Sequence, residues 1–352
     1  MLTSNSFSNN NVKHKRQLFW QIPLLLFLIV GTIYIVRQQQ SMPYHHKTGF
    51  IFGTTYSITY QCENDLSAEI EKAMKEVDDE FSMFNKQSTV SQINRGEKPV
   101  LSSKFKEVFK LAEKVHQNTE GAFDVTVAPL VNAWGFGFKN EQMPTPLQVD
   151  SLCSIIGMHR LTFDEEQSTI TKSDPRVMLD FSAIAKGYGA DCVARVLKKN
   201  GVSNFMVEIG GEVVTKGVSP SRLPWRIGVT KPVDDSLQVS QELQTVLNIT
   251  DRAMATSGNY RNFYYKNGRK YAHTIDPHTG YPVQHSILSA TVLAAECATA
   301  DAYATSFMVM GLDSAKTLLD SHPELLAYII YSNQEGALEV WYSPALAEKI
   351  NE

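Results

Sequence analysis

The chain has 352 residues, of which 43% are hydrophobic and 20% are charged, so it has ample material for a globular core. Its 33 Lys and Arg residues against 37 Asp and Glu residues give a formal net charge of −4 at pH 7. Nucleic-acid-binding domains normally show a basic excess or a basic stripe, and this charge balance argues against that class.

The N-terminal segment differs in composition from the rest of the chain. A polar stretch ends in the basic cluster KHKR at residues 13–16, and residues 18–36 then contain no charged residue. A helix of this length spans a hydrocarbon core of ~30 Å, so we expect a transmembrane signal-anchor. The positive-inside rule leaves residues 1–17 in the cytoplasm and the remainder outside it. A cleaved signal peptide is disfavoured, because its apolar core is usually only ~7–15 residues and no small-x-small cleavage site follows here.

Beyond the anchor we expect a linker at residues 37–47 and then a regular series of secondary-structure elements. Apolar residues at helical spacing predict helices at 66–81, 103–118, 183–201, 297–310 and 313–321. Short alternating runs predict strands at 50–61, 204–209, 225–230, 245–250 and 286–295, and hairpins at 260–275 and 325–342. Asn267-Gly268 supplies the two positive-φ positions of a type I′ turn in the first hairpin.

The order of these elements indicates the fold class. Strands and helices do not alternate regularly, which favours an α+β architecture with mixed or antiparallel sheets and packed helices over a doubly wound parallel sheet. The residues outside the membrane form either one large domain or two packed lobes. The four cysteines are far apart and include no C-x-x-C pair, so neither a disulfide framework nor a cysteine-based zinc site is predicted.

The segment TADAYATSF at residues 299–307 places a carboxylate and a hydroxyl on one helix face. Asp301 and Thr305 are four positions apart, so their side chains are neighbours on a helix. Together they are able to ligate Mg²⁺, with substrate phosphates completing its shell. In the alternative, Thr305 bonds to its own backbone and Asp301 is favoured by the helix dipole. Both interpretations remain open from these residues.

Two glycine-containing segments are candidates for phosphate or ligand contacts. DFSAIAKGYGAD at 180–191 places Lys186 at a helix start, where free N–H groups attract anions. It is not a Walker loop, so a P-loop kinase or ATPase is excluded. In VEIGGE, Gly210 and Gly211 end a predicted strand, where a backbone is able to approach a ligand or simply to turn.

Two further segments carry weaker signals. ATSGNY at 255–260 suits a flavin or nucleotide edge, and equally an ordinary loop. In residues 121–138, Asp124 sits within an apolar, strand-like run that is followed by Trp134, Phe136 and Phe138. Such aromatic residues form either core or a stacking platform.

Each signal is weak alone, but their order and spacing together resemble the ApbE family of FAD:protein FMN transferases. The segments that carry this resemblance are FGTTY, FS with STVSQIN, GAFDVTVAPLVNAWGFG, DFSAIAKGYGAD, VEIGGE, ATSGNY, HTIDPHTGYP and ADAYATSF. It covers residues 48–345, which we therefore expect to form an ApbE-like catalytic domain with FAD in a cleft.

The resemblance implies an activity. Family members cleave the pyrophosphate of FAD, attach FMN through a phosphoester to a Thr or Ser hydroxyl of a target protein, and release AMP, with Mg²⁺ as cofactor. The expected targets are membrane redox subunits of the Na⁺-translocating NADH:quinone reductase or Rnf type. Some relatives mainly hydrolyse FAD, so a FAD pyrophosphatase remains an alternative. A non-catalytic flavin-binding protein of the bacterial envelope is the third hypothesis.

The resemblance also implies roles for individual residues. Mg²⁺ ligands are expected at Asp301, Thr305 and the backbone carbonyl of Ala183, for one ion or two. FAD contacts are expected at Phe52, Phe84, Ala122, Phe123, Asp124, Asp180, Lys186, Gly210, Gly211, Thr256, Ser257 and Ile275. Phe84 stands where many relatives have Tyr, which keeps stacking but removes the hydroxyl.

The resemblance places the catalytic base at His273, within HTIDPHTGYP. A neutral imidazole suits the removal of a hydroxyl proton near neutral pH, although a histidine also serves as a metal ligand. Asp276, Pro277 and Gly280 are expected to shape the turn that presents His273, and His278 is expected to be a solvated loop residue.

Overall fold

The computed structural model describes residues 21–34, 37, 42–137, 143–232, 242–259, 263–266 and 269–351. An eight-stranded sheet forms its centre, and every neighbouring pair of strands in it is antiparallel. In spatial order the strands are β1 (Tyr44–Ile51), β2 (Thr54–Gln61), β5 (Phe205–Ile209), β6 (Glu212–Lys216), β9 (Ala253–Gly258), β12 (Ile287–Ala294), β13 (Leu326–Ser332) and β14 (Leu338–Tyr342). The predicted α+β class is therefore confirmed.

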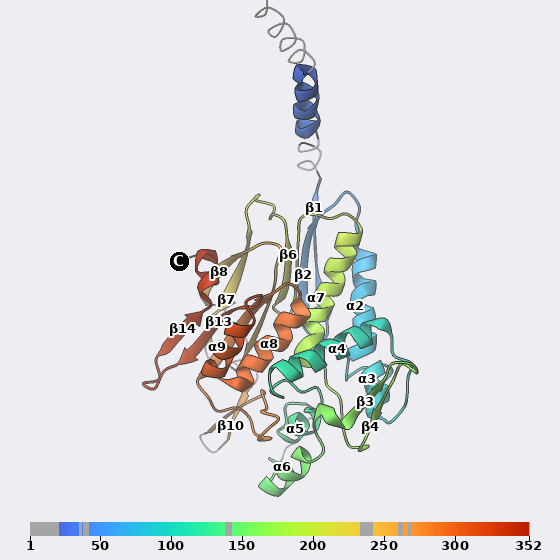
Figure 1. Cartoon of the computed structure of the whole chain (residues 1–352), viewed down its shortest axis with the longest axis vertical. Helices are drawn as coiled ribbons and strands as arrows, with labels where there is room; N and C mark the ends of the chain where they lie inside the picture. The colour runs from blue at the N-terminus through green and yellow to red at the C-terminus, as the bar shows by residue number, and fades with distance from the viewer. Residues whose placement is uncertain are drawn as a thin grey trace, which may run out of the picture.

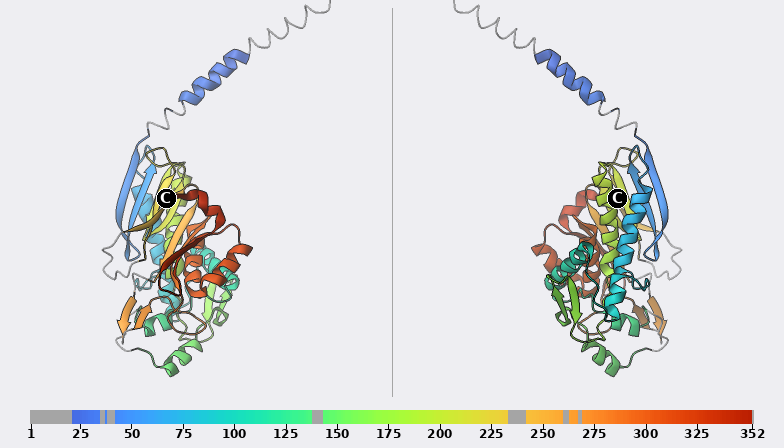
Figure 2. Two further views of the ribbon diagram at one scale, coloured as in Figure 1. Left: turned by 90° about the vertical axis from the view of Figure 1, so that its left-hand side faces the viewer. Right: turned by 90° about the vertical axis from the view of Figure 1, so that its right-hand side faces the viewer.

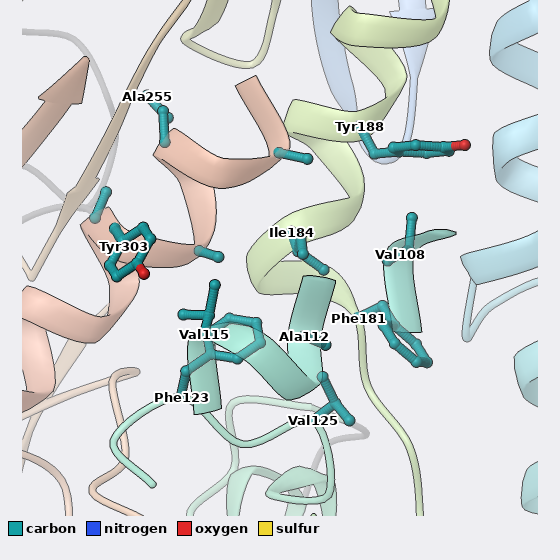
Figure 3. Packing of buried hydrophobic residues seen from close by; sticks show 14 of the residues in the cluster. Val108, Ala112, Val115, Phe123, Val125, Phe181, Ile184, Tyr188, Ala255 and Tyr303 are labelled. Carbon is teal, nitrogen blue, oxygen red and sulfur yellow. The ribbon is translucent and has the colours of Figure 1, made fainter. Parts of the chain in front are cut away.

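Helices cover one face of this sheet (Figure 1). They are α2 (Ser67–Phe81), α4 (Ser103–Asn118), α7 (Ser182–Lys199), α8 (Cys297–Met310) and α9 (Leu312–Ser321). Their bounds agree with the predicted helices to within a few residues. α2, α4 and α9 each bury one stripe of apolar side chains at helical spacing, whereas α7 and α8 are buried over most of their circumference. Figure 3 shows side chains of α4, among them Val108, Ala112 and Val115, beside Ile184 of α7 and Phe181 just before it.

A second, three-stranded sheet packs against the other face of the central sheet. It has the order β15 (Ile350–Asn351), β8 (Leu243–Ile249), β7 (Trp225–Thr230). The interface is apolar, with Trp225 and Leu247 of the small sheet buried against Val213 and Met254 of the large one. The helices and the small sheet thus cover the two faces of the central sheet.

Short elements form a lobe at one end of the molecule, around α5 and α6 in Figure 1. They comprise α3 (Thr89–Asn94), α5 (Ala128–Ala133), α6 (Pro146–Cys153), β3 (Leu161–Asp164), β4 (Thr169–Lys172), β10 (Phe263–Lys266), β11 (Arg269–Ala272) and the 3₁₀ turn Met158–Arg160. A second 3₁₀ turn, Pro344–Lys349, instead contacts β13 and β8. The predicted hairpin of β10 and β11 is confirmed, while its Asn267-Gly268 turn lies outside the described residues.

Two sequence-based expectations are corrected near the start of the globular part. The strand expected at 50–61 is interrupted, because Phe52 and Gly53 form a turn with φ values of 52° and 74°. The resulting hairpin begins at Tyr44, so residues 44–47 are in β1 although we expected them in the linker. Gly53 adopts the left-handed region without a Cβ penalty, and together with Phe52, also at positive φ, it turns the alternating run back on itself.

The strand-like run around Asp124, within residues 121–138, is a third correction. Only Val127 makes a bridge, to Met178, and α5 begins at Ala128. Asp124 Oδ1 accepts hydrogen bonds from Thr126 N at 2.7 Å and Thr126 Oγ1 at 2.6 Å, which bends the backbone. Pro129 lies in the first turn of α5, where its missing N–H has no helical partner to lose.

The N-terminal residues 21–34 are helical and lie apart from the globular body (Figure 2). Their apolar side chains are exposed, with Leu24 at 60% and Phe27 at 75% of full accessibility. In the part of the chain that the structure describes, no helix is both long and apolar enough to cross a membrane. The stretch predicted as an anchor, 18–36, extends beyond the described residues at both ends, and the predicted cytoplasmic tail 1–17 lies wholly outside them.

Candidate active site

One cavity of about 1370 Å³ is lined by every residue of the predicted site. Its walls come from segments that are distant in sequence: the β1–β2 turn, the end of α2, the 122–137 segment, the start of α7, the β5–β6 turn, β9, the 273–277 loop and α8. Pockets for drug-sized ligands are about 300–1,000 Å³, so this volume suits a larger, dinucleotide-sized molecule.

An oxygen-rich corner of the cavity is built on α8 and β9. Asp301 and Thr305 lie one helical turn apart, as predicted, and Thr305 Oγ1 is 3.1 Å from Ser257 Oγ of β9. The Asp301 carboxyl is only 2% exposed, and its Oδ2 accepts a hydrogen bond from Gly187 N of α7 at 3.0 Å. Burial raises the pKa of Asp301, against the opposing effect of the Lys186 charge.

Ala183 lies in the first turn of α7, beside this corner. In a regular helix its carbonyl would pair with Gly187 N, but here Asp301 competes for that same donor. The carbonyl, the carboxylate and the Thr305 hydroxyl are all hard oxygen donors of the kind that Mg²⁺ accepts. Within the described ranges no three His, Cys, Asp or Glu side chains form a metal-binding cluster, so a cation bound here would depend on these mixed oxygens and on oxygens of a ligand.

Lys186 connects this corner to a carboxylate that the sequence reasoning missed. Its ammonium forms a short ion pair with Oε1 of Glu212, the first residue of β6, whose side chain is 2% exposed. Burial raises the pKa of Glu212 to about 7, although the Lys186 charge lowers it. Burial alone would lower the pKa of Lys186, but Asp301 and Glu212 outweigh it and raise that pKa. The only sequence signal for Glu212 is its position directly after Gly210-Gly211 in VEIGGE.

His273 follows β11 and lines the same cavity, with its ring centroid 6.4 Å from that of Phe136. The loop after it is a tight turn: Asp276 accepts hydrogen bonds from His278 N at 2.9 Å and Thr279 Oγ1 at 3.0 Å. Gly280 has φ +75°, and a Cβ there would lie 2.4 Å from Cys153 Sγ. Asp276 and Gly280 therefore shape the turn as predicted, with Pro277 between them.

His278 is exposed, but both nitrogens of its ring also contact other residues. Its Nε2 lies 2.8 Å from the Glu120 carbonyl, and its Nδ1 lies 3.1 Å from Asp276 Oδ1. Partial burial lowers the pKa of His278, but these two acceptors outweigh that effect and raise it. The ring joins the His273 loop to the segment that carries Ala122, Phe123 and Asp124, so the prediction of a simple solvated residue was incomplete.

The aromatic side chains divide into core and cavity wall. Trp134 is buried and donates from Nε1 to the Gly280 carbonyl at 2.8 Å, so it supports the loop rather than a ligand. Phe136 lines the cavity, and Phe138 lies outside the described residues. Phe84 is 83% exposed at the rim, and Phe52, with φ 52°, lies against Gly189, where a Cβ would come within 2.5 Å of its ring.

Comparison with known proteins decides the family. Residues 52–330 match the ApbE family. The chain belongs to the ApbE family. This ApbE protein is 37% identical over 304 residues to the FAD:protein FMN transferase of Haemophilus influenzae, covering 82% of this chain and 87% of the relative. It is 38% identical over 305 residues to that of Vibrio cholerae, covering 84% and 89%.

Solved structures agree with this assignment. The flavin transferase ApbE from Vibrio cholerae superimposes with a TM-score of 0.79 at 36% identity, covering 88% of this chain and 99% of that one. The flavinyl transferase ApbE of Pseudomonas stutzeri, in its apo form, has a TM-score of 0.76 at 28% identity, covering 88% and 97%. The ApbE fold thus extends over the globular part of the chain, including the cavity.

Proposed function

We propose that this ApbE protein transfers FMN from FAD to a Thr or Ser hydroxyl of an acceptor protein and releases AMP. The observation that carries the proposal is the single cavity in which an oxygen-rich corner, Lys186 and His273 meet. The relatives named FAD:protein FMN transferase support it, since each is aligned over most of its length. We further propose Mg²⁺ as the cofactor.

The transfer is a phosphoryl-type displacement. The acceptor oxygen forms a bond to the flavin-side phosphorus, the bond from that phosphorus to the bridging oxygen breaks, and AMP leaves with that oxygen. Catalysis of such a step depends on in-line positioning and on compensation of phosphate charge. Lys186 contributes a fixed positive charge beside the phosphates, and Thr256 and Ser257 contribute hydroxyls along the same wall.

The metal and proton steps are assigned to separate residues. Asp301, Thr305 and the Ala183 carbonyl would hold Mg²⁺, which supplies charge neutralisation on the pyrophosphate when bound. His273 takes the proton of the attacking hydroxyl as general base. Phe52, Phe84 and the 122–124 segment would hold the flavin nucleotide, with Phe84 stacking from the rim.

We also propose that the N-terminal segment anchors the enzyme in the bacterial inner membrane with the catalytic domain on the periplasmic side. The uncharged run 18–36 and the exposed apolar side chains of residues 21–34 support this location. Membrane redox subunits of the NADH:quinone reductase or Rnf type would then be suitable acceptors, because both proteins share one membrane.

The test uses the full-length chain in detergent with FAD, Mg²⁺ and a flavin-acceptor protein. We expect the acceptor to gain the mass of FMN less one water, with AMP formed in equal amount and both products abolished by chelator. Free FMN and AMP with an unmodified acceptor would instead establish the pyrophosphatase. Bound FAD with no product would establish the non-catalytic flavin-binding protein.

A further inference from the structure

Glu212 carries a buried carboxylate oxygen that the proposed mechanism does not use. Oε1 is paired with Lys186, but Oε2 has no hydrogen-bond partner among the described residues. The same is true of Glu80 Oε2 and Ser289 Oγ, but neither of those residues lines the cavity. Glu212 is therefore the residue at which an unpartnered, buried oxygen coincides with the ligand space.

Such an oxygen is costly unless a ligand supplies a donor. A buried polar atom without a partner destabilises a protein by about 1–3 kcal/mol, and more when it is charged, so native structures rarely keep one without a reason. A single ammonium partner on Oε1 leaves the lone pairs of Oε2 unused. Oε2 is thus poised to accept a hydrogen bond from whatever occupies the cavity.

The turn before Glu212 brings two cavity-lining glycines next to that oxygen. Gly210 has φ +66°, and a Cβ there would lie 3.3 Å from Glu212 Oε2. Gly211 has φ +103° and open space where a side chain would be. Both conformations favour glycine, so this turn places no side chain between the cavity and the buried Oε2.

The charges around Glu212 indicate which part of FAD lies there. Lys186 interacts with both Glu212 and Asp301, which places Glu212 next to the phosphate end of the site. A second carboxylate beside a pyrophosphate is repulsive unless it receives a donor. In FAD the groups flanking the pyrophosphate on either side are polyols, the ribityl chain and the adenosine ribose, whose hydroxyls are donors of the kind that a carboxylate prefers.

We propose that Glu212 Oε2 accepts a hydrogen bond from a sugar-type hydroxyl of FAD adjacent to the pyrophosphate, on the ribityl or the ribose side. Glu212 then has two roles in one carboxylate: Oε1 fixes the Lys186 ammonium beside the phosphates, and Oε2 selects a nucleotide with a hydroxyl at this point. The proposal rests on the proposed function, because it takes FAD as the molecule in the cavity.

The first experiment measures binding to full-length protein in chelator, without turnover, for FAD, FMN and AMP separately. We expect Glu212→Gln to weaken FAD binding by about tenfold or more, since hydrogen bonds to charged groups are the stronger kind. Only one of the two halves should lose affinity: FMN if the hydroxyl is on the ribityl chain, AMP if it is on the ribose. Equal affinity of wild type and variant for all three molecules would overturn the proposal.

Glu113→Gln is the matched control. Glu113 lies on α4, is half-buried with a pKa raised mainly by burial, and does not line the cavity. We expect this variant to bind FAD as wild type does. Melting temperatures of both variants establish that each is folded.

A second experiment separates a direct hydrogen bond from an effect through Lys186. It uses analogues of the affected half that lack single hydroxyls: FMN analogues missing a ribityl hydroxyl, or 2′,3′-dideoxy-AMP. If Glu212 binds the hydroxyl, one analogue binds wild type and Glu212→Gln equally. If Glu212→Gln weakens the binding of every analogue as much as it weakens the binding of the unmodified nucleotide, Glu212 acts only by positioning Lys186. That result would overturn the proposal.

Two further outcomes are distinguishable. Weaker Mn²⁺ binding to Glu212→Gln in the absence of nucleotide would make Glu212 a cation ligand instead and would overturn the hydroxyl contact. Failure of wild type to flavinylate any acceptor would remove the proposed function, but it would leave these nucleotide affinities, and the contact they report, measurable.

Discussion

At the residue scale, Asp301 combines burial, a backbone hydrogen bond and a neighbouring cation. We predict that Asp301→Asn lowers Mg²⁺-dependent turnover by at least about 10²-fold, because loss of a charged metal ligand removes several kcal/mol of charge stabilisation. The amide oxygen still accepts from Gly187 N, so the fold is expected to persist. Turnover against Mg²⁺ concentration is the measurement, with exposed Asp320→Asn as control. Wild-type rates at all Mg²⁺ concentrations would remove Asp301 from the metal site.

His273 and His278 form a matched pair in one loop. We predict that His273→Ala loses transfer while retaining FAD affinity, because the proton acceptor is removed and the stacking residues stay in place. His278→Ala is expected to keep transfer within a few-fold, since its ring contacts the Glu120 carbonyl and Asp276. Acceptor flavinylation and FAD fluorescence quenching report the two properties separately. Loss of FAD binding in His273→Ala would indicate a structural role.

Sequence order predicted which residues line the cavity, but not the pairing of Glu212. The predicted residues lie within short motifs, so each motif carries its own local signal. The Lys186–Glu212 pair joins two motifs that are 26 positions apart, and it exists only because α7 crosses the start of β6. A glycine pair followed by Glu is typical of an ordinary turn, so the sequence alone gives no sign that the Glu212 carboxylate is buried.

At the scale of elements, the crossing of α7 and α8 positions the oxygen-rich corner. Gly187 is at the contact: a Cβ there would lie 2.4 Å from the Cys297 carbonyl oxygen and 2.7 Å from its carbon. Because backbone atoms cannot move aside as a flexible side chain does, we predict that Gly187→Ala destabilises the protein by about 1–3 kcal/mol. It should also reduce turnover, since separating the helices lengthens the Gly187–Asp301 hydrogen bond.

Denaturant unfolding and Mg²⁺-dependent turnover together test this prediction. Lys199→Ala, on an exposed position of the same helix, is the control for helix propensity. Gly187→Ala with wild-type stability and turnover would show that the two helices tolerate a wider spacing.

Asp191 joins the same two helices by capping α8. Its two carboxylate oxygens accept from Cys297 N at 2.9 Å and Ala298 N at 2.8 Å. Burial raises the pKa of Asp191 to about 6 from its ordinary 3.8, despite these hydrogen bonds. Between these pH values the folded state binds more protons than the unfolded state, so the contribution of Asp191 to stability falls as pH rises from 4 to 6.

We predict that Asp191→Asn flattens this part of the stability curve. At 1.36 kcal/mol per pKa unit the wild-type loss attributable to Asp191 is up to about 3 kcal/mol. Glu212 and Asp301, also with raised pKa values, contribute in the same direction, so the difference between variant and wild type is the relevant quantity. This difference is obtained by measuring the unfolding free energies of both proteins from pH 4 to 7. Parallel curves of unfolding free energy against pH would contradict the prediction.

The long helices were predictable because one face repeats apolar residues over several turns, and α4 begins and ends where the periodicity does. The turn around Asp124 was not predictable in this way. Phe123 and Val125 alternate with polar residues as in a strand, but Asp124 accepts hydrogen bonds from Thr126 that fix a turn. Period alone does not distinguish the two for such short runs.

At the scale of the whole molecule, the antiparallel sheet explains what sequence order leaves undetermined. β5 lies between β2 and β6, and β9 lies beside β6, although about 140 and 40 positions separate these neighbours. Hairpin neighbours such as β1 and β2 follow from a local turn, whereas these long-range pairs depend on burial of both faces. Residues from distant motifs line the cavity because it lies near the ends of several of these paired strands.

In the described part of the chain, the N-terminal segment leads into the globular body at the start of β1, so the proposed anchor should be separable from catalysis. Met42 and Pro43 contact the body just before β1: the Met42 carbonyl accepts from Gln61 Nε2 at 2.9 Å and the Pro43 carbonyl from Cys62 N at 3.1 Å. We predict that a chain starting at Met42 folds and flavinylates a soluble acceptor at the wild-type rate, since none of residues 1–41 lines the cavity among the described residues.

The same truncated chain should no longer associate with membranes, because the uncharged run 18–36 is removed with it. Co-sedimentation with phospholipid vesicles measures this loss. Full-length Leu24→Arg/Phe27→Arg is the matched control: it keeps the length of the segment but adds charges that cost about 2.5–3.5 kcal/mol each at a bilayer centre. Both variants should remain in the supernatant and retain activity on a soluble acceptor, while flavinylation of a membrane-embedded acceptor falls. Vesicle binding by the truncated chain would instead assign membrane association to the catalytic domain.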